Sequence, residues 1–575
     1  MSAPIGGLRV ALFLTGTGTP RDLLETWQAW QQDAPEAARL HLLAIEPWPK
    51  PAAEWLPDLP PALSALGARL GEAWWGLVPG LHRMAFERGR VTVSVFVGPA
   101  QDALRELAFT ADEVHLGAAG AAVPRDAAAL RPVARLCRRG TVLRASDADE
   151  SLRHGLASAG FVIRHDRGES LEAIYAPAWT PRVRRGDARR GNERHGSEHA
   201  VVVGGGLAGA AVASSLARRG WRVQVIDAAA HPASGASALP AGLLAPHVSP
   251  DDNLLSRLSR AGLRLTRAEA QALLRPGVDW DGQGTLEHRI KPASRRKERD
   301  APPADALESL LQRRPAVGFA DDWSCAAGAR HKQEALLPGN AAALWHARAA
   351  WIRPGALVRA WLDQPGIAWR GGLQVQRIEH DAGTWHLFDS NGRALADAPL
   401  LVVAAALGSA PLLDHRLLLH PVRGQVSWAP HRPGQRLPAR PVNGNGHFLP
   451  AVPLDGGMAW MSGSSYGRGE RELQPREADH QANFERIRTL LPAVADQLAP
   501  EFAAGRVQAW TGVRCASGDR RPLVGEIAPG LWVSTAMGSR GLTFAALCAE
   551  LIASRLHEEP LPLPLSLAMA LDAHR

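Results

Sequence analysis

The stretch AVVVGGGLAGAAVASSLARRGWRVQVIDAA, residues 200–229, decides the fold of most of this chain. Small, strand-forming residues lead into a glycine-rich segment, 204–209, that fits the pattern G-x-G-x-x-G. A helical segment follows and ends at Gly220, and a second strand ends at Asp227, about 20 residues beyond the glycines. This order predicts a strand–turn–helix–strand unit that binds a dinucleotide.

The residue type at each key position of this stretch has a physical explanation. Gly204 permits the tight turn, Gly206 lets a pyrophosphate approach the backbone, and Gly209 lets helix and strand pack closely. Asp227 is placed to accept hydrogen bonds from a ribose diol. The alternative is a glycine-rich turn in an ordinary α/β sheet. The preceding strand, the capped helix and the acid at this distance favour the dinucleotide site.

Two further segments favour FAD over NAD as the dinucleotide. The small residues of 234–237 suit a loop that wraps phosphates, and 538–541 form a second glycine-rich turn that runs into a helix. In flavoproteins of the two-dinucleotide fold, the C-terminal helix directs its N-terminus at the flavin, which suits an electron-rich reduced ring. Further predicted FAD-binding residues are therefore Ser234, Gly235, Ala236, Ser237, Gly538 and Gly541.

The part of the chain before this stretch is predicted to be a domain of its own. Residues 1–178 alternate strand-like and helix-like segments, which is typical of a doubly wound α/β domain. The arginine-rich residues 179–199 are interpreted either as an exposed linker or as a basic strap that touches a polyanion. Residues 200–575 form the second domain, with a basic insertion at 288–307 that is predicted to lie on the surface.

Composition limits the class of protein. No apolar run is long enough to span a bilayer, and the 46% hydrophobic and 21% charged content is typical of a soluble globular protein. The net charge of +8 favours an anionic partner, either nucleic acid or a membrane surface. The four cysteines form no CxxC pair, so we expect reduced thiols, a cytoplasmic protein and no metal site.

Several phrases carry a family resemblance. Residues 200–575 resemble the D-amino-acid-oxidase/glycine-oxidase superfamily of FAD enzymes. More narrowly, five phrases in order resemble the bifunctional tRNA 5-methylaminomethyl-2-thiouridine biosynthesis family, which joins an N-terminal methyltransferase to a C-terminal FAD oxidoreductase. The phrases are PVRGQVS (421–427), GSSYGRG (463–469), GVRCASGDRRPLVGEI (512–527), GSRGLTFAALCAELIASRL (538–556) and EPLPLP (559–564).

The front half resembles the same family more weakly. Gly16 and Gly18 stand in a segment similar to its glycine-rich S-adenosylmethionine loop, and Glu46 ends the strand whose acid holds that cofactor's ribose. Two positions depart from the pattern: Pro99 replaces an acid, and Gly117, in HLGAAGAAVP (115–124), replaces the Asp of an Asp-Gly-Phe-Ala-Pro loop. A Gly/Ala loop offers no polar side chain to hold an amine, so we expect weak methylation or none, unless backbone carbonyls or other residues do this work. The chain also starts almost at its first strand, so a segment of the family pattern is expected to be absent there.

The resemblance implies a reaction on tRNA. Oxidation would remove the carboxymethyl group from 5-carboxymethylaminomethyl(-2-thio)uridine at the wobble position, and methylation would then give 5-methylaminomethyl(-2-thio)uridine. The substrate carboxylate needs a cation, ideally a bidentate Arg, and we rank Arg520, Arg540 and Arg514 in that order, with Arg423 as a further candidate. The alternative for each of these arginines is a surface position or a structural salt bridge. Tyr466 is predicted either to shape the pocket or to pack under the sheet.

Other candidates are weighed beside this one. His247, His420 and His447 show no catalytic spacing, so we expect structural or surface roles for them. A first rival function is a glycine or D-amino-acid oxidase that acts on free amino acids, with a relic front domain. A second is that the front domain is only a tRNA-binding module that feeds the oxidase.

Overall fold

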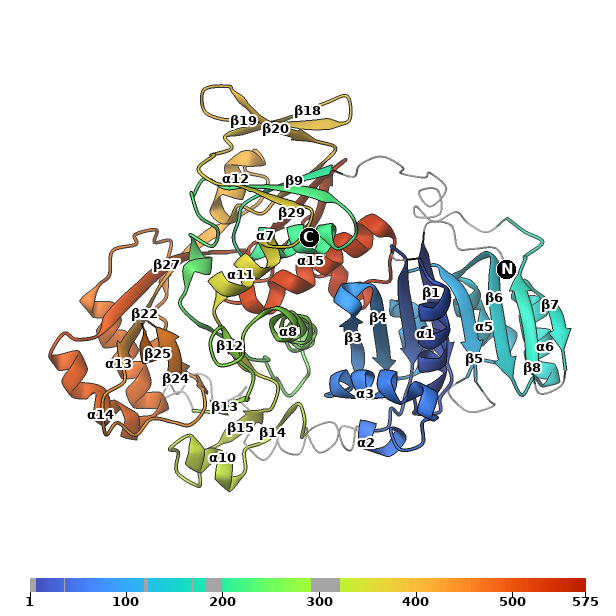
Figure 1. Cartoon of the computed structure of the whole chain (residues 1–575), viewed down its shortest axis with the longest axis horizontal. Coiled ribbons are helices and arrows are strands. Elements are labelled where there is room, and N and C mark those ends of the chain that lie inside the picture. The colour runs from blue at the N-terminus through green and yellow to red at the C-terminus, as the bar shows by residue number, and fades with distance from the viewer. Residues whose placement is uncertain are drawn as a thin grey trace. The chain divides into compact units, whose positions relative to one another are not determined.

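The computed structural model describes residues 7–35, 37–117, 123–167, 170–180, 199–290, 321–454 and 456–575 (Figure 1). The chain forms two compact units. The first unit contains Met1–Gly196 and also Ala553–Ala570, and the second contains Ser197–Pro315, Ala320–Ile552 and Leu571–Arg575. The basic linker and most of the insertion at 288–307 lie outside the described residues.

The first unit is built on an eight-stranded sheet of order β3-β4-β2-β1-β5-β6-β8-β7. The strands β4, β2, β1, β5 and β6 run parallel to their neighbours, and β3, β8 and β7 add antiparallel edges. The strands are β1 Leu8–Leu14, β2 Arg39–Ile45, β3 Gly80–Phe86, β4 Val91–Val97, β5 Ala111–Leu116, β6 Cys137–Ser146, β7 Phe161–Asp166 and β8 Ser170–Tyr175. The helices are α1 Arg21–Asp33, α2 Ala52–Trp55, α3 Ser64–Ala73, α4 Ala100–Glu106, α5 Ala127–Ala134 and α6 Glu150–Ser158.

Strand β1 shows why this unit folds as a layered α/β domain. Val10 and Leu12 belong to one hydrophobic core, whereas Ala11 and Phe13 belong to another on the opposite face. Because successive side chains of a strand point to opposite faces, an apolar run such as LRVALFL needs cover on both sides. The predicted α/β fold of residues 1–178 is confirmed. The neighbours of β1 are β2 and β5, so the loop after β1 lies where the strand order reverses, the usual ligand position in such sheets.

The second unit contains a mainly parallel six-stranded sheet of order β17-β10-β9-β21-β29-β28 and a nine-stranded sheet that includes β13, β23, β24, β25, β22 and β27. Its described strands are β9 His199–Val203, β10 Arg222–Ile226, β11 Gly242–Leu244, β12 Trp280–Asp281, β13 Thr285–His288, β14 Ser324–Ala326, β15 Ala343–His346, β16 Ala350–Ile352, β17 Ile367–Arg370, β18 Arg377–Asp381, β19 Thr384–Phe388, β20 Ala394–Ala398, β21 Leu400–Val403, β22 His420–Pro430, β23 Val442–Gly444, β24 Gly446–Leu454, β25 Gly457–Gly463, β26 Gly467–Arg468, β27 Gln508–Ala516, β28 Leu523–Ala528 and β29 Leu531–Thr535.

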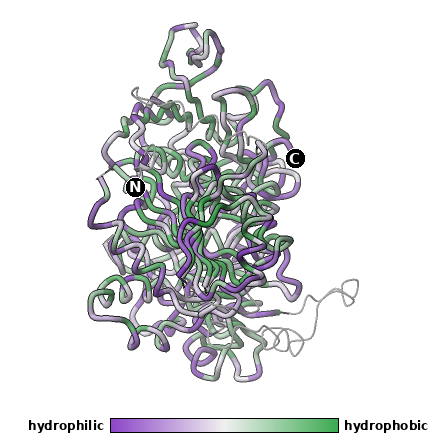
Figure 2. The backbone as a smooth tube through the Cα atoms, turned by 90° about the vertical axis from the view of Figure 1, so that its right-hand side faces the viewer, coloured by the Kyte–Doolittle hydropathy of each residue, from purple (hydrophilic) through white to green (hydrophobic). Residues whose placement is uncertain are grey.

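The helices described in the second unit are α7 Leu207–Ala217, α8 Leu254–Leu273, α10 Ala329–Glu334, α11 Pro354–Leu362, α12 Ser409–Leu412, α13 Glu477–Leu490, α14 Pro492–Ala503 and most of α15 Gly541–His557. The helix α16 Leu565–Met569 belongs to the first unit. Strand β9 is buried from Ala200 to Val203, as its apolar sequence predicts. Figure 2 shows hydrophobic backbone stretches running through the middle of the view, with polar stretches mainly at its edges.

The C-terminal segment 553–570 is part of the first unit, a membership that the expected domain of 200–575 did not include. Arg83, on β3, is 3% exposed and donates hydrogen bonds to the carbonyl oxygens of Pro560 and Leu561. The imidazole of His41 lies 3.5 Å from the carboxylate of Glu559, and both side chains are buried. These polar contacts are enclosed in the unit, so the segment contributes to its stability.

We predict that Arg83→Met weakens the first unit by roughly 1–3 kcal/mol, because two buried carbonyl groups lose their donor. Hydrogen exchange of β3 and β4 measures the opening free energy of these strands. The control is Arg105→Met, an exposed side chain whose ion pair with Asp102 spans 4.0 Å, and its expected effect is within about 0.5 kcal/mol. Equal protection in the two variants would contradict a structural role for the segment.

Candidate functional site

The main cavity of the second unit has a volume of about 840 Å³. It is lined from the end of β9, from the loop 234–237, from β27, from the turn 536–540 and from the first residues of α15. It therefore brings together two stretches that lie more than half the chain apart and that both carry predicted cofactor residues. Of these residues, Gly204, Gly206, Asp227, Ser234, Gly235, Ala236, Ser237, Gly538 and Gly541 line it.

The glycines of the first turn are required for different reasons. Gly204 has φ +113°, a conformation that side chains disfavour, and a Cβ there would lie 2.5 Å from the carbonyl oxygen of Ala404. A Cβ on Gly209 would lie 1.8 Å from the carbonyl oxygen of Gly204, so this glycine allows α7 to pack on β9. At Gly206 the nearest atom to such a Cβ is the Ser237 hydroxyl oxygen, at 3.1 Å. The backbone at Gly206 is thus open toward the cavity.

Two polar side chains hold the first glycine turn through hydrogen bonds to the backbone. The carboxylate of Asp227 accepts hydrogen bonds from the backbone N–H groups of Gly205 and Ala229, at 2.5 and 2.8 Å. A carboxylate has about four acceptor positions, so Asp227 keeps capacity for a ribose diol in the cavity. The hydroxyl of Ser237 accepts from the N–H of Leu207, at the start of α7.

A second glycine turn places another helix at the cavity. Gly538 has φ +56°, and its N–H donates to the carbonyl of Cys515 on β27. Residues 541–543, the first of α15, line the cavity, and a Cβ on Gly541 would touch the side chain of Leu207 at 3.1 Å. The N-termini of α7 and α15 therefore converge, and both carry the partial positive charge that favours phosphate and reduced flavin.

A partly buried ion network holds these two helices together. Glu550 on α15 accepts hydrogen bonds from Ser215 on α7 and from Arg218 and Arg219, which directly follow that helix. Arg218 also pairs with Glu269 on α8, at 2.8 Å. Although burial opposes ionisation, the two guanidinium groups hold the pKa of Glu550 well below its usual value.

Arg514, on β27, is the cation best placed to bind a carboxylate in the cavity. Its guanidinium donates to the hydroxyl of Ser464 and lies 4.9 Å from the ring centroid of Tyr466. Its Nη1 atom is buried and has no hydrogen-bond partner among the residues that the structure describes. A Cβ on Gly424 would lie 2.4 Å from this guanidinium, so the glycine of the VRGQ segment leaves room for it.

The other predicted arginines lie elsewhere. Arg540 lines the cavity and is half-buried, and burial lowers its pKa. Arg520, ranked first from the sequence, is exposed and does not line the cavity. Arg423, on β22 of the nine-stranded sheet, is 1% exposed and pairs with Asp479, so its charge is already compensated. Tyr466 is 55% exposed at the cavity, which places it under Arg514 rather than in a core.

Two histidines that sequence reasoning set aside line the same cavity. Burial, with the nearby Arg514, lowers the pKa of His447 to about 4, so its imidazole is neutral at pH 7. Burial and the charge of Arg540 also lower the pKa of His247. Neither histidine lies in a recognisable motif; only the pairing of strands β23, β24 and β27 with their neighbours brings His447 to the cavity. His420 is exposed and does not line it.

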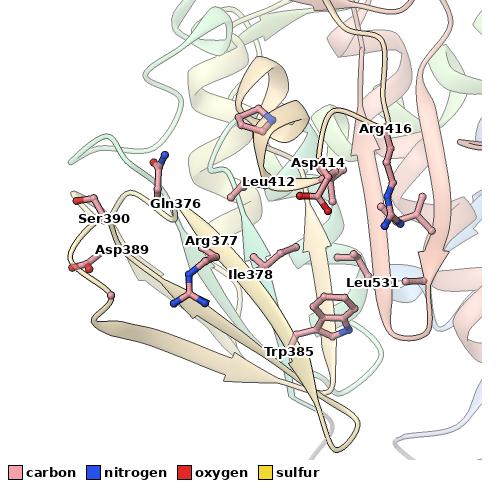
Figure 3. Close-up of a pocket in the computed structure, with 15 residues that line it drawn as sticks. Gln376, Arg377, Ile378, Trp385, Asp389, Ser390, Leu412, Asp414, Arg416 and Leu531 are labelled. Atoms are coloured by element: carbon pink, nitrogen blue, oxygen red, sulfur yellow. The ribbon is translucent and has the colours of Figure 1, made fainter.

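A second cavity of about 540 Å³ lies beside the three-stranded sheet β18–β20 (Figure 3). Arg377, Trp385 and Asp414 line it, and Figure 3 shows their side chains. None of the residues predicted from the sequence lines this cavity. The main cavity is therefore the candidate site of this unit.

The first unit has a similar glycine loop after β1. Gly16 and Gly18 have φ +61° and +74°, and the carboxylate of Glu46 accepts hydrogen bonds from the N–H groups of Gly18 and Trp48. Glu46 is 4% exposed, and burial raises its pKa. At Gly117 a Cβ would lie 2.5 Å from the carbonyl oxygen of Thr15, so position 117 has no room for a side chain. Residues 118–122 of the altered loop lie outside the described residues.

Among the residues that the structure describes, there is neither a membrane-spanning helix nor a metal site. No helix there is both long and apolar enough to cross a bilayer. Within the same residues, no group of three or more His, Cys, Asp or Glu side chains is arranged to hold a metal ion.

The fold and cavity of the second unit define a flavoprotein. Residues 199–555 match the family of FAD dependent oxidoreductases (DAO), to which the chain belongs, and FAD is the cofactor of this unit. The glycine oxidase of Geobacillus kaustophilus has a similar fold, with a TM-score of 0.52 and 20% identity, over 66% of this chain and 99% of that one. The L-proline dehydrogenase of P. horikoshii gives a TM-score of 0.51, with 16% identity over 66% and 97%.

Relatives that match nearly the whole chain identify a more specific family. The tRNA 5-methylaminomethyl-2-thiouridine biosynthesis bifunctional protein MnmC of Polaromonas sp. (strain JS666 / ATCC BAA-500) is 45% identical, over 97% of this chain and 89% of its own length. The protein of the same name from Verminephrobacter eiseniae (strain EF01-2) is 42% identical, over 98% and 95%. The chain belongs to this bifunctional family, and the resemblance inferred from the sequence is confirmed.

The residues of the main cavity fit FAD. The open backbone at Gly206 and the N-terminus of α7 would receive the pyrophosphate, and Asp227 the ribose of the adenosine. The N-terminus of α15 would face the flavin ring. The individual FAD contacts of these residues stay predictions.

We predict that Gly209→Ala abolishes FAD binding, because the new Cβ would push α7 off β9 and displace the turn at Gly206. Flavin content, read from the visible absorbance of the purified protein, measures this. The matched control is Gly339→Ala, since a Cβ there meets no atom within 4 Å. Full flavin content in Gly209→Ala would show that the close packing is not required.

A pH prediction follows from His447. Its folded pKa of about 4 lies below the ordinary value of 6.5, so between these two pH values the unfolded chain binds the proton more readily. The free energy of unfolding should therefore fall as the pH drops through this window, and His447→Gln should flatten that fall. Urea unfolding of the second unit at several pH values measures it. The control is His420→Gln, which changes an exposed imidazole of the same unit and should leave the slope as in the wild type.

Proposed function

We propose that this protein modifies the wobble uridine of tRNA in two steps. In the first, its second unit oxidises the 5-carboxymethylaminomethyl group, with or without a 2-thio group on the ring, to 5-aminomethyl. In the second, its first unit methylates the amine to 5-methylaminomethyl with S-adenosylmethionine. The observation that carries the first step is Arg514 in the FAD cavity, with a buried Nη1 that has no hydrogen-bond partner in the described part of the chain. Because the substrate is tRNA, we place the protein in the cytoplasm.

The first step is chemically an oxidation of an N-substituted glycine. The CH₂ of the carboxymethyl group loses two electrons, its C–N bond becomes an imine, and water cleaves the imine to glyoxylate and the primary amine. FAD, when bound, accepts the two electrons and a hydrogen from this carbon. Glyoxylate carries away the two carbons of the carboxymethyl group, and the amine stays on the uridine.

The protein's own residues orient the substrate. The guanidinium of Arg514 binds the carboxylate, and its bond to Ser464 together with its stacking on Tyr466 fixes the direction of the donor fork. Its partial burial strengthens this charge pairing relative to water. The neutral imidazole of His447 adds no competing positive charge beside Arg514 at pH 7.

The second step is assigned to the first unit. The loop of Gly16 and Gly18 at the switch point of the sheet would receive S-adenosylmethionine, with Glu46 near its ribose. The bifunctional names of relatives that match nearly the whole chain support methylation. The absence of side-chain space at Gly117 is consistent with the expectation of weak methylation, which stays a prediction.

Nucleoside mass spectrometry of tRNA tests both steps. A strain that lacks this gene should accumulate 5-carboxymethylaminomethyl uridine, and the wild-type gene should remove it. If the complemented strain then holds 5-aminomethyl uridine, the first unit does not methylate at a useful rate and serves at most as a binding module. Unchanged tRNA in the deletion strain, with oxidation of free glycine or sarcosine by the purified protein, would instead identify an amino-acid oxidase.

We predict that Arg514→Gln lowers kcat/KM for the oxidation roughly 10- to 100-fold, because a charged hydrogen bond to the carboxylate is lost. Arg514→Lys should recover part of this loss, since it keeps the charge without the planar fork. Arg471→Gln, an exposed arginine in the same unit, is the control. Wild-type kinetics in Arg514→Gln with normal flavin content would assign the carboxylate to another residue.

A further inference from the structure

Three arginines in or beside the main cavity have no carboxylate partner within the described part of the chain. They are Arg514 on β27, Arg540 just before α15, and Arg520 in the turn between β27 and β28. A buried arginine of the same sheet, Arg423, is paired instead with Asp479. Like charges without counter-charges repel one another, so this group is stabilised when anions bind to it.

The three cations differ in depth. Arg514 is half-buried, with its Nη1 fully enclosed, Arg540 is half-buried on the cavity lining, and Arg520 is exposed. The charge of Arg520 contributes to lowering the pKa of Arg540, so these two guanidinium groups are electrostatic neighbours. Tyr466 interacts with both Arg514 and Arg540. The bridge between Ala516 and Met537 and the pairing of Leu523 with Thr535 place the turn that carries Arg520 beside the segment that leads to Arg540.

The number of cations exceeds what the reacting group needs. The carboxymethylaminomethyl side chain carries one carboxylate, and one guanidinium binds a carboxylate through two parallel hydrogen bonds. A free amino acid would offer nothing anionic to the remaining two arginines. A nucleotide inside an RNA chain, by contrast, has a phosphodiester on each side, and arginine is a preferred phosphate ligand.

Building on the function proposed above, we propose that Arg514 alone holds the carboxylate, whereas Arg540 and Arg520 bind the phosphodiester groups that flank the modified uridine. The two outer arginines then determine specificity: they favour the nucleotide in a polynucleotide over the same side chain on a free nucleoside or amino acid. This differs from the roles expected from the sequence, in which all three competed for the carboxylate.

Steady-state oxidation kinetics with two substrates test this assignment. The substrates are tRNA with 5-carboxymethylaminomethyl uridine at the wobble position and the free nucleoside with the same modification. The variants are Arg540→Gln, Arg520→Gln, Arg540→Lys and Arg514→Gln, with Arg471→Gln as the exposed control. Flavin content and thermal unfolding of each purified holoenzyme show that it is folded.

The ratio of kcat/KM for tRNA to that for the nucleoside is the decisive quantity. We expect it to fall roughly tenfold in Arg540→Gln and in Arg520→Gln, and to recover in Arg540→Lys. The slope of log kcat/KM for tRNA against log salt concentration should become shallower by about one per lost phosphate contact. Arg514→Gln should lower both rates together and leave the ratio and the salt slope near the wild-type values.

Other outcomes overturn the proposal. An equal loss on both substrates in Arg540→Gln would make this residue a carboxylate ligand or a support of the flavin. A ratio and salt slope unchanged from the wild type in both outer variants would place the phosphate contacts elsewhere. If the wild-type enzyme oxidises neither modified substrate but does oxidise free glycine, the proposed function itself fails, and that result is distinct from either of the others.

Discussion

A largely buried carboxylate, that of Glu550, joins the two helices on which the flavin site depends. It pairs with Arg218 and Arg219, so that α15 is fixed against α7. The first residues of both helices line the main cavity, and their backbone N–H groups are useful to a dinucleotide only if the two ends keep their spacing. Charges buried in this way cost solvation, and removing one partner would leave the others uncompensated. The network therefore makes the position of the flavin helix a property of the whole unit, and not of the glycine turn alone.

The two units stabilise their glycine turns with the same kind of hydrogen bond. In each unit, a carboxylate at the end of the second strand accepts a hydrogen bond from a backbone N–H group of the glycine turn that follows the first strand. Asp227 accepts from Gly205, and Glu46 accepts from Gly18. The carboxylate thereby shapes the turn before any ligand binds, and a preorganised turn reduces the entropy that binding would cost. An acid at this spacing therefore indicates a nucleotide site, because its carboxylate shapes the glycine turn in addition to contacting a ribose.

The residues of the substrate side were harder to infer than those of the cofactor side. Arg514, Arg520 and Arg540 all stand in matching phrases, and the sequence ranks Arg520 first, then Arg540 and Arg514. Their depth separates them: one has an enclosed guanidinium nitrogen, one lines the cavity, and one is exposed. His247 and His447 were set aside because they lack motif spacing, yet both reach the cavity. Cross-strand pairing and loop position, which local sequence does not encode, decide such placements.

The amino-acid sequence by itself determined the cofactor turns, the order of the two units and the family. These features depend on glycine at particular backbone conformations and on short apolar strands, both of which are local properties. Only the tertiary structure decided which of the arginines line the flavin cavity, that Gly117 has no space for a side chain, and that residues 553–570 complete the first unit. Each of these depends on contacts between segments far apart in the chain, where packing and burial, rather than residue type, determine the outcome.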